Sequence, residues 1–160
     1  MPGVNEIPIA HTPPGGWRGE MPPPVLAGCT DPLVSPAPDL RGLWIVEQVE
    51  VNGTPAPPEH RAYGMLQRIE QAVDRMVVTG GGVIHDMRCD GTAGNGVNDV
   101  AERDFKTEIT VVASYEHGVH VLRPVGIPVE VTRRRDGDEM IWTYPGFTAR
   151  LRRVNDSSAK

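Results

Sequence analysis

Residues 105–115 have the sequence FKTEITVVASY, in which apolar and polar side chains alternate along the chain. Phe105, Ile109 and Tyr115 belong to one face of an extended strand, and the positions between them are mostly polar. A period of two directs one row of side chains into a core and the other towards solvent. The pattern therefore predicts a half-buried β-strand rather than a helix.

The same alternation recurs on both sides of this segment, and short turn motifs separate the runs. Glycine-containing turns at 116–118, 136–138 and 145–146 are typical of tight connections between antiparallel neighbours. We expect one short helix near Pro58 to Tyr63 and strands at 43–51, 63–71, 74–79, 83–89, 105–115, 119–123, 128–135, 139–144 and 147–154. Eight or nine strands in a chain of 160 residues predict an all-β fold, a single antiparallel up-and-down β-barrel.

The first forty residues differ in composition from the rest of the chain. They are rich in proline, as at Pro22-Pro23-Pro24, and proline disfavours both helices and central strands. Because this stretch also carries apolar residues such as Trp17, we expect residues 1–40 to be either an arm wrapped on the barrel or a disordered tail. Residues 41–154 then form the barrel, and residues 155–160 a flexible tail.

Charge and hydropathy exclude two classes of partner. The net charge is -5 and the pI about 5.5, which argues against a nucleic-acid partner because phosphate binding needs a basic face. No segment has the roughly 18 apolar residues of a membrane span, so no membrane partner is expected. The densest positive run, Arg133-Arg134-Arg135, is either a solvated strand end or an anion site.

The cysteines bear on the compartment. Cys29 and Cys89 do not make a disulfide framework, and we expect two free thiols in a reducing cytoplasm. Residues 26–29 are similar to a lipoprotein cleavage site, but the proline-rich residues 18–24 cannot form the apolar helix that such a signal needs. We therefore expect a cytoplasmic protein, either a monomer or a homodimer.

The first and last predicted strands carry a recognisable pair of motifs. The first opens with Asp39-Leu40-Arg41-Gly42-Leu43-Trp44, and the last ends with Arg150-Leu151-Arg152-Arg153. This combination resembles the bacterial lipocalin-like proteins of the calycin superfamily over residues 39–154. The resemblance implies that Trp44 closes one end of the barrel and that Arg153 packs over its ring, where packing and a cation–π interaction combine. The similarity extends to segments 68–71, 74–78 and 137–142.

The chain departs from secreted lipocalins in lacking their signal peptide, their disulfide and their later loop motifs. It also lacks the Gly-x-Trp-x-Gly run of haem-binding nitrobindin-like barrels, so neither haem nor another cofactor is expected. The resemblance leaves a barrel whose interior is either filled solid or holds one small ligand. We expect a cavity with a wall built from Met65, Ile69, Met87, Phe105, Ile109, Val111, Tyr115, Trp142, Tyr144 and Phe147.

The predicted strand 83–89 carries the residue best suited to chemistry, His85. It shares one face with Val83, Met87 and Cys89, whereas Asp86 and Arg88 share the other. If the first face lines the cavity, His85 is a buried polar group that needs a partner. It is then either a core histidine bonded to a neighbouring strand, or a general base or hydrogen-bond donor to a ligand. Asp99 is a further catalytic candidate if its loop folds inward.

No metal site is expected. His85 and Cys89 would lie about 13 Å apart at roughly 3.3 Å per residue of strand, too far to share an ion. His117 and His120 flank a turn as a surface pair without further ligands. The glycines at 91, 94 and 96 do not predict a nucleotide loop, because no helix follows them.

Two functions remain. One is binding of a small hydrophobic or amphipathic molecule, with His85, Tyr115 and Tyr144 as the polar groups of the cavity. The other is a cofactor-free isomerase, lyase or cyclase in which His85 moves a proton. A His85 side chain that contacts an acid such as Asp99 favours catalysis, and one bonded only to backbone favours binding.

Overall fold

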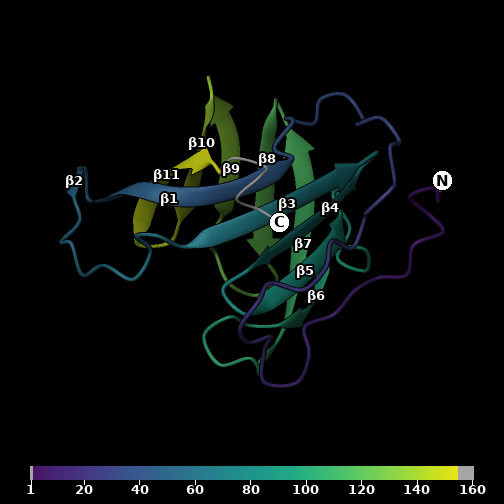
Figure 1. Ribbon diagram of the computed structural model, residues 1–160, viewed down its shortest axis with the longest axis horizontal. Coiled ribbons are helices and arrows are strands. Elements are labelled where there is room, and N and C mark those ends of the chain that lie inside the picture. The colour runs from purple at the N-terminus through teal and green to yellow at the C-terminus, as the bar shows by residue number, and fades with distance from the viewer. Residues whose placement is uncertain (1, 155–160) are drawn as a thin grey trace.

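The computed structural model describes residues 2–154 and has one eleven-stranded antiparallel sheet (Figure 1). The strands are β1 Gly42–Val51, β2 Thr54–Pro55, β3 Leu66–Ala72, β4 Arg75–Gly80, β5 Val83–Arg88, β6 Val97–Val100, β7 Glu108–Glu116, β8 Val119–Pro124, β9 Val131–Asp136, β10 Glu139–Tyr144 and β11 Phe147–Arg153. The described residues contain no helix. The predicted tail at 155–160 lies outside them.

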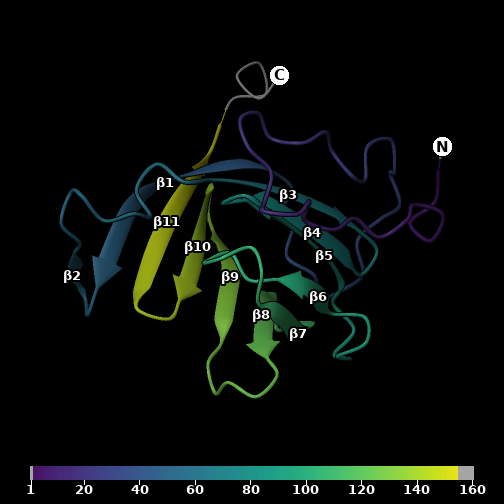
Figure 2. The ribbon, with the colours of Figure 1, turned by 90° about the horizontal axis from the view of Figure 1, so that it is seen from below.

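The sheet curls into a nearly closed barrel. Its strand order is β5-β4-β3-β1-β11-β10-β9-β8-β7-β6, with β2 paired to β1 at the side. The two ends of this order, β5 and β6, lie next to each other (Figure 2). Isolated hydrogen bonds occur at this seam instead of a ladder. Arg88 N at the end of β5 donates to Asn95 O, just before β6, at 2.7 Å, and Gly91 N, beyond β5, donates to Ala113 O on β7 at 2.9 Å.

The all-β antiparallel barrel is confirmed, but the expected number of eight or nine strands is wrong. The additional strands, β2 and β6, are too short to show an alternating pattern. The predicted strand 105–115 begins only at Glu108, because Phe105 has a positive φ of 55° and lies in a bend. The helix expected near Pro58 to Tyr63 is also wrong, since successive turns occupy that segment.

Trp44 lies near the start of β1, within the barrel core. Its ring is fully buried, and its Nε1–H donates to Leu40 O at 2.8 Å. Arg153 pairs with Trp44 in the β1–β11 ladder, and its Cζ atom lies 4.8 Å from the ring centroid, which confirms the predicted stacking. Gly42 makes room for it: φ is 140° there, and a Cβ atom would lie 3.1 Å from Arg153 Nε. Both the backbone conformation and the nearby Arg153 side chain therefore favour glycine at position 42.

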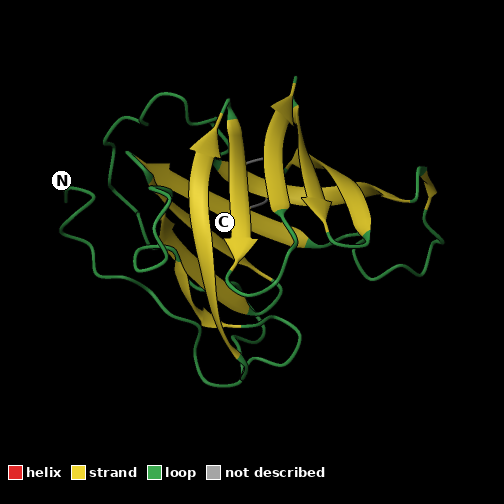
Figure 3. Ribbon diagram, turned by 180° about the vertical axis from the view of Figure 1, so that it is seen from behind, coloured by secondary structure: helices red, strands yellow, loops and turns green. Residues whose placement is uncertain are grey.

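Much of the N-terminal segment, residues 2–39, lies against the outer face of β3, β4 and β5. Figure 3 shows this segment as loop against the strands. Trp17 fixes one part of it, because its backbone N donates to Gly82 O at 2.9 Å and its Nε1–H to Val83 O at 3.0 Å. A second apolar cluster fills the space beneath the segment, separate from the barrel core. Its buried members are Val4, Leu26, Ala72, Val77 and Ile84.

Candidate functional site

A cavity of about 270 Å³ lies inside the barrel, where the inward faces of the strands leave space between their side chains. Its volume lies near the lower end of the range of small-molecule sites, roughly 300–1,000 Å³. Most of its wall is apolar. The predicted wall residues that line it are Met65, His85, Met87, Ile109, Val111, Trp142 and Tyr144.

The other predicted wall residues lie elsewhere. Ile69 and Phe147 belong to the packed barrel core, where Phe147 stacks on Tyr144 with ring centroids 5.4 Å apart. The Tyr115 hydroxyl accepts a hydrogen bond from Gln71 Nε2 at 2.9 Å, and burial raises the pKa of Tyr115. Phe105 packs on Gly82 outside the cavity, because the chain turns before β7 begins.

His85 lines the cavity but is held by the backbone. Its Nε2 lies 3.0 Å from the carbonyl oxygen of Val100, across the seam between β5 and β6. A carbonyl only accepts, so Nε2 carries the proton and the neutral ring keeps its lone pair on Nδ1. Burial lowers the pKa of His85, which favours this neutral form. His85 therefore joins the barrel seam and can still accept a hydrogen bond.

Asp99 does not meet His85 as a catalytic partner. Its Oδ2 accepts a hydrogen bond from Thr12 N at 3.1 Å and lies 3.3 Å from His11 Nδ1. Its Oδ1 accepts from the backbone N of Val100 at 2.8 Å. The carboxylate thus binds residues of the N-terminal segment. The structure does not bring together the acid and the histidine that the catalytic hypothesis needs.

A row of three polar side chains crosses the interior instead. His120 on β8 pairs with Arg133 on β9, and Arg133 pairs with Trp142 on β10, so all three share the inward face. Each is at least 95% buried. Among the described residues, four buried nitrogens of this row have no hydrogen-bond partner: His120 Nδ1 and Nε2, Arg133 Nη1 and Trp142 Nε1.

Two members of this row are not recognised as site residues from the sequence. The prediction of His120 as a surface histidine is wrong, because β8 begins at Val119 and directs the next side chain inward. The arginine run is solvated only in part: Arg134 is exposed, whereas Arg133 is buried. The alternation of side chains along β9 could have revealed the buried arginine, because it places Arg133 on the same face as Val131.

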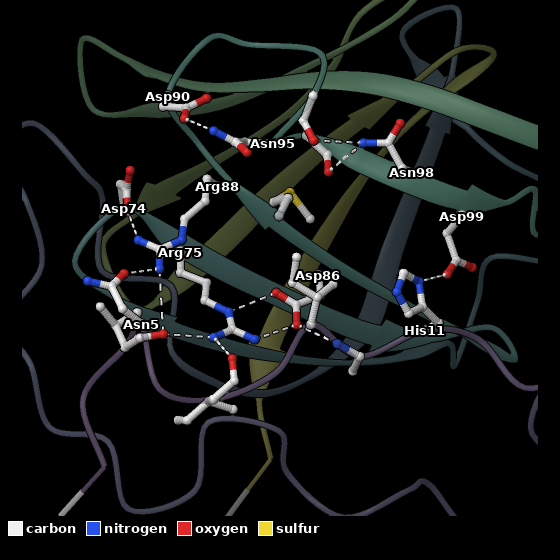
Figure 4. A pocket seen from close by; sticks show the side chains of 17 residues that line it. Asn5, His11, Asp74, Arg75, Asp86, Arg88, Asp90, Asn95, Asn98 and Asp99 are labelled. Atoms are coloured by element: carbon white, nitrogen blue, oxygen red, sulfur yellow. Dashed lines mark hydrogen bonds and ion pairs between the residues drawn. The ribbon is translucent and has the colours of Figure 1, made fainter.

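A larger hollow of about 470 Å³ lies outside the barrel, between the N-terminal segment and β5 and β6 (Figure 4). Its charged side chains satisfy one another. Arg75 pairs with Asp86 at 2.7 Å, and Arg88 pairs with Asp74 at 2.7 Å. None of its lining residues carries one of the buried unpartnered atoms found among the described residues. The hollow is therefore explained by contacts that hold the segment, and the interior cavity is the better candidate site.

The thiols and the possible metal ligands add no reactive group. Cys29 and Cys89 are free, and burial raises the pKa of the Cys89 thiol to about 12, so it stays protonated at neutral pH. Within residues 2–154, no three histidine, cysteine, aspartate or glutamate side chains gather in a metal-binding arrangement. The same residues include no helix with the length and apolarity to span a bilayer.

We expect the protein to lose stability in mild acid. Burial lowers the pKa of His85 and lowers that of His120 well below its ordinary value. The unfolded histidines bind protons below about pH 6.5, whereas the folded ones resist protonation. The stabilisation is therefore complete above that pH and is lost as the pH falls towards the folded pKa values. Urea unfolding at about pH 7.5 and about pH 5.5 measures the difference.

Two variants test whether a buried histidine causes this pH dependence. His120→Leu removes a buried titrating group and should reduce the loss between the two pH values. His117→Asn is the control, because His117 is exposed on the same hairpin and its positive φ of 52° suits asparagine. Equal unfolding free energies at both pH values would contradict the assignment of buried neutral histidines.

Comparison with known proteins assigns no family. No protein-family model matches the chain, and a search of curated proteins found no match. The function of the site therefore has to be inferred from its own geometry and chemistry.

Proposed function

We propose that the chain binds a small hydrophobic or amphipathic molecule inside the barrel. The observation that carries the proposal is the cavity of about 270 Å³, which is lined mainly by apolar side chains of the strands and of the loops beside them. Polar groups interrupt this wall, among them His85, Arg133 and Tyr144. Apolar walls give affinity and a few placed polar groups orient the ligand, which is the usual design of small-molecule sites.

Binding is better supported than catalysis. Proton transfer by His85 in an isomerase, lyase or cyclase would be helped by an acid that orients its ring. His85 is bonded to the carbonyl of Val100, and Asp99 is engaged by His11 and Thr12. A backbone-bonded histidine can still direct a ligand, since its Nδ1 lone pair accepts a hydrogen bond.

The proposal includes a lipocalin-like identity and a cytoplasmic location. Arg153 stacked on Trp44 supports the first, because it reproduces the pairing that the resemblance implies. The free thiols of Cys29 and Cys89 support a reducing compartment. The net charge of -5 agrees with a protein that has no nucleic-acid partner. We propose a bacterial protein that is a monomer or a homodimer and has no membrane partner.

Native mass spectrometry of the protein purified from its own host tests the proposal. We expect a retained small molecule in the wild-type protein. Ile109→Trp places a larger ring in the cavity and should remove the adduct. Glu108→Trp is the matched control, because the neighbouring side chain is exposed. An adduct that survives in Ile109→Trp, or a wild-type protein without one, would refute interior binding.

A further inference from the structure

Arg133 is a buried cation inside the barrel. Its side chain is inward on β9 and only 5% exposed, and it lines the cavity. Burial lowers the pKa of Arg133 to about 10, which still leaves it charged at neutral pH. Buried charges are normally paired, because removing a charge from water is costly. A counterion for Arg133 is therefore expected inside the barrel.

The described residues do not supply that partner. Arg133 donates one hydrogen bond, from Nε to Gln67 Oε1 at 3.1 Å, and Gln67 is neutral. No carboxylate among residues 2–154 forms an ion pair with Arg133. Glu102, whose charge acts on Arg133 from the cavity wall, is instead 3.7 Å from Arg61. The guanidinium is thus oriented by an amide but is not neutralised.

Further donors lie beside this cation. Trp142 Nε1–H is buried without an acceptor, and its ring lies 5.6 Å from Arg133 Cζ. Neutral His120, on the other side, has one N–H that is also without an acceptor. Unsatisfied buried donors are rare in native proteins. Arg133 and Trp142 line the cavity, whereas His120 does not. The guanidinium and the neighbouring indole N–H are therefore the complement of an anion that accepts hydrogen bonds.

We propose that the ligand is a small amphipathic carboxylate, whose anionic end pairs with Arg133 and whose apolar end fills the rest of the cavity. This inference rests on the proposed binding function and narrows it. A carboxylate brings a single charge, matching the one buried guanidinium of the wall, since the other, Arg103, is exposed to solvent. A phosphate monoester brings about −1.5 to −2 at neutral pH. The carboxylate of Glu102 in the wall adds repulsion against a dianion.

The size of the cavity sets the length of the ligand. At roughly 30 Å³ for each water-sized group, a volume of about 270 Å³ holds on the order of nine or ten non-hydrogen atoms. Octanoate has this size, and octan-1-ol has the same chain with a neutral head. Octyl phosphate adds the higher charge. These three probes separate the charge of the head group from the apolar chain.

Calorimetric titration of the three probes tests the inference. We expect the wild-type protein to bind octanoate about tenfold or more tightly than octan-1-ol, and more tightly than octyl phosphate. Arg133→Met keeps an unbranched side chain of similar length but removes the charge, and it should abolish this preference. Arg134→Met is the matched control: the neighbouring arginine is exposed on the opposite face, and the preference should remain.

Thermal unfolding separates binding from folding. Replacing an unpaired buried charge with an apolar side chain should raise the Tm of the ligand-free protein. A lower Tm together with loss of both octanoate and octan-1-ol would assign Arg133 to folding and overturn the inference. Equal wild-type affinities for those two probes, or tighter binding of octyl phosphate, would overturn the carboxylate and leave interior binding standing. Failure of all three probes to bind would overturn both proposals.

Discussion

Replacing Trp44 with alanine is expected to lower the free energy of unfolding by roughly 3–5 kcal/mol. The indole is fully buried in the barrel core, so its removal leaves a cavity there. The variant also removes the donor to Leu40 O and the ring on which Arg153 stacks. Urea unfolding followed by circular dichroism measures the loss.

A second substitution separates packing from charge at the same place. Arg153→Met retains an apolar side chain over the indole and removes only the cation–π contribution, about 0.5–1 kcal/mol. We therefore expect a much smaller loss than in Trp44→Ala. If Trp44→Ala also lost less than about 1 kcal/mol, Trp44 would not be a well-packed part of the barrel core.

Asp86→Asn is expected to lower the free energy of unfolding by roughly 3–5 kcal/mol, because it leaves the buried Arg75 charge without a counterion. The pair has side-chain exposures of 3% and 1%, with Arg75 Nη2 2.7 Å from Asp86 Oδ2 (Figure 4). Asp86 Oδ2 also accepts a hydrogen bond from Ala10 N at 2.9 Å. The effect should therefore include loosening of the N-terminal segment.

Hydrogen exchange gives a second measurement for Asp86→Asn, and a variant of a surface ion pair serves as its control. The amide of Ala10 should exchange faster in Asp86→Asn, since its acceptor is weakened. Glu116→Gln, in the exposed pair with Arg123, should lower the free energy of unfolding far less than Asp86→Asn does, because solvent screens the pair. Similar small losses in both variants would show that the Arg75–Asp86 pair does not anchor the segment.

Alternating patterns predict the barrel well because each strand buries one face. Trp142 and Tyr144 line the cavity as that pattern predicts, and His85 and Met87 share its interior. Arg153 lies over Trp44 because the strand pairing sets both on one end of the barrel. These features depend on local periodicity and on the position of a residue within its own strand.

The errors arise where neighbouring strands or backbone turns decide the outcome. Phe105 continues the apolar period, but the chain turns there, so its ring covers Gly82. Arg133 looks solvated from its charge, yet the strand places it inward beside Trp142. Asp99 binds the backbone of Thr12, a contact between distant segments that no local pattern encodes.

The indole N–H signals in a ¹⁵N-edited NMR spectrum give the most direct test of interior binding. Trp17 Nε1–H and Trp44 Nε1–H donate to carbonyls, at 3.0 Å and 2.8 Å, whereas Trp142 Nε1–H is without an acceptor and its ring lines the cavity. During titrations with octanoate or octan-1-ol, we predict that the Trp142 signal moves and the other two stay in place. Trp142→Phe identifies the signal. A Trp142 signal that remains fixed in both titrations would contradict a ligand-binding barrel.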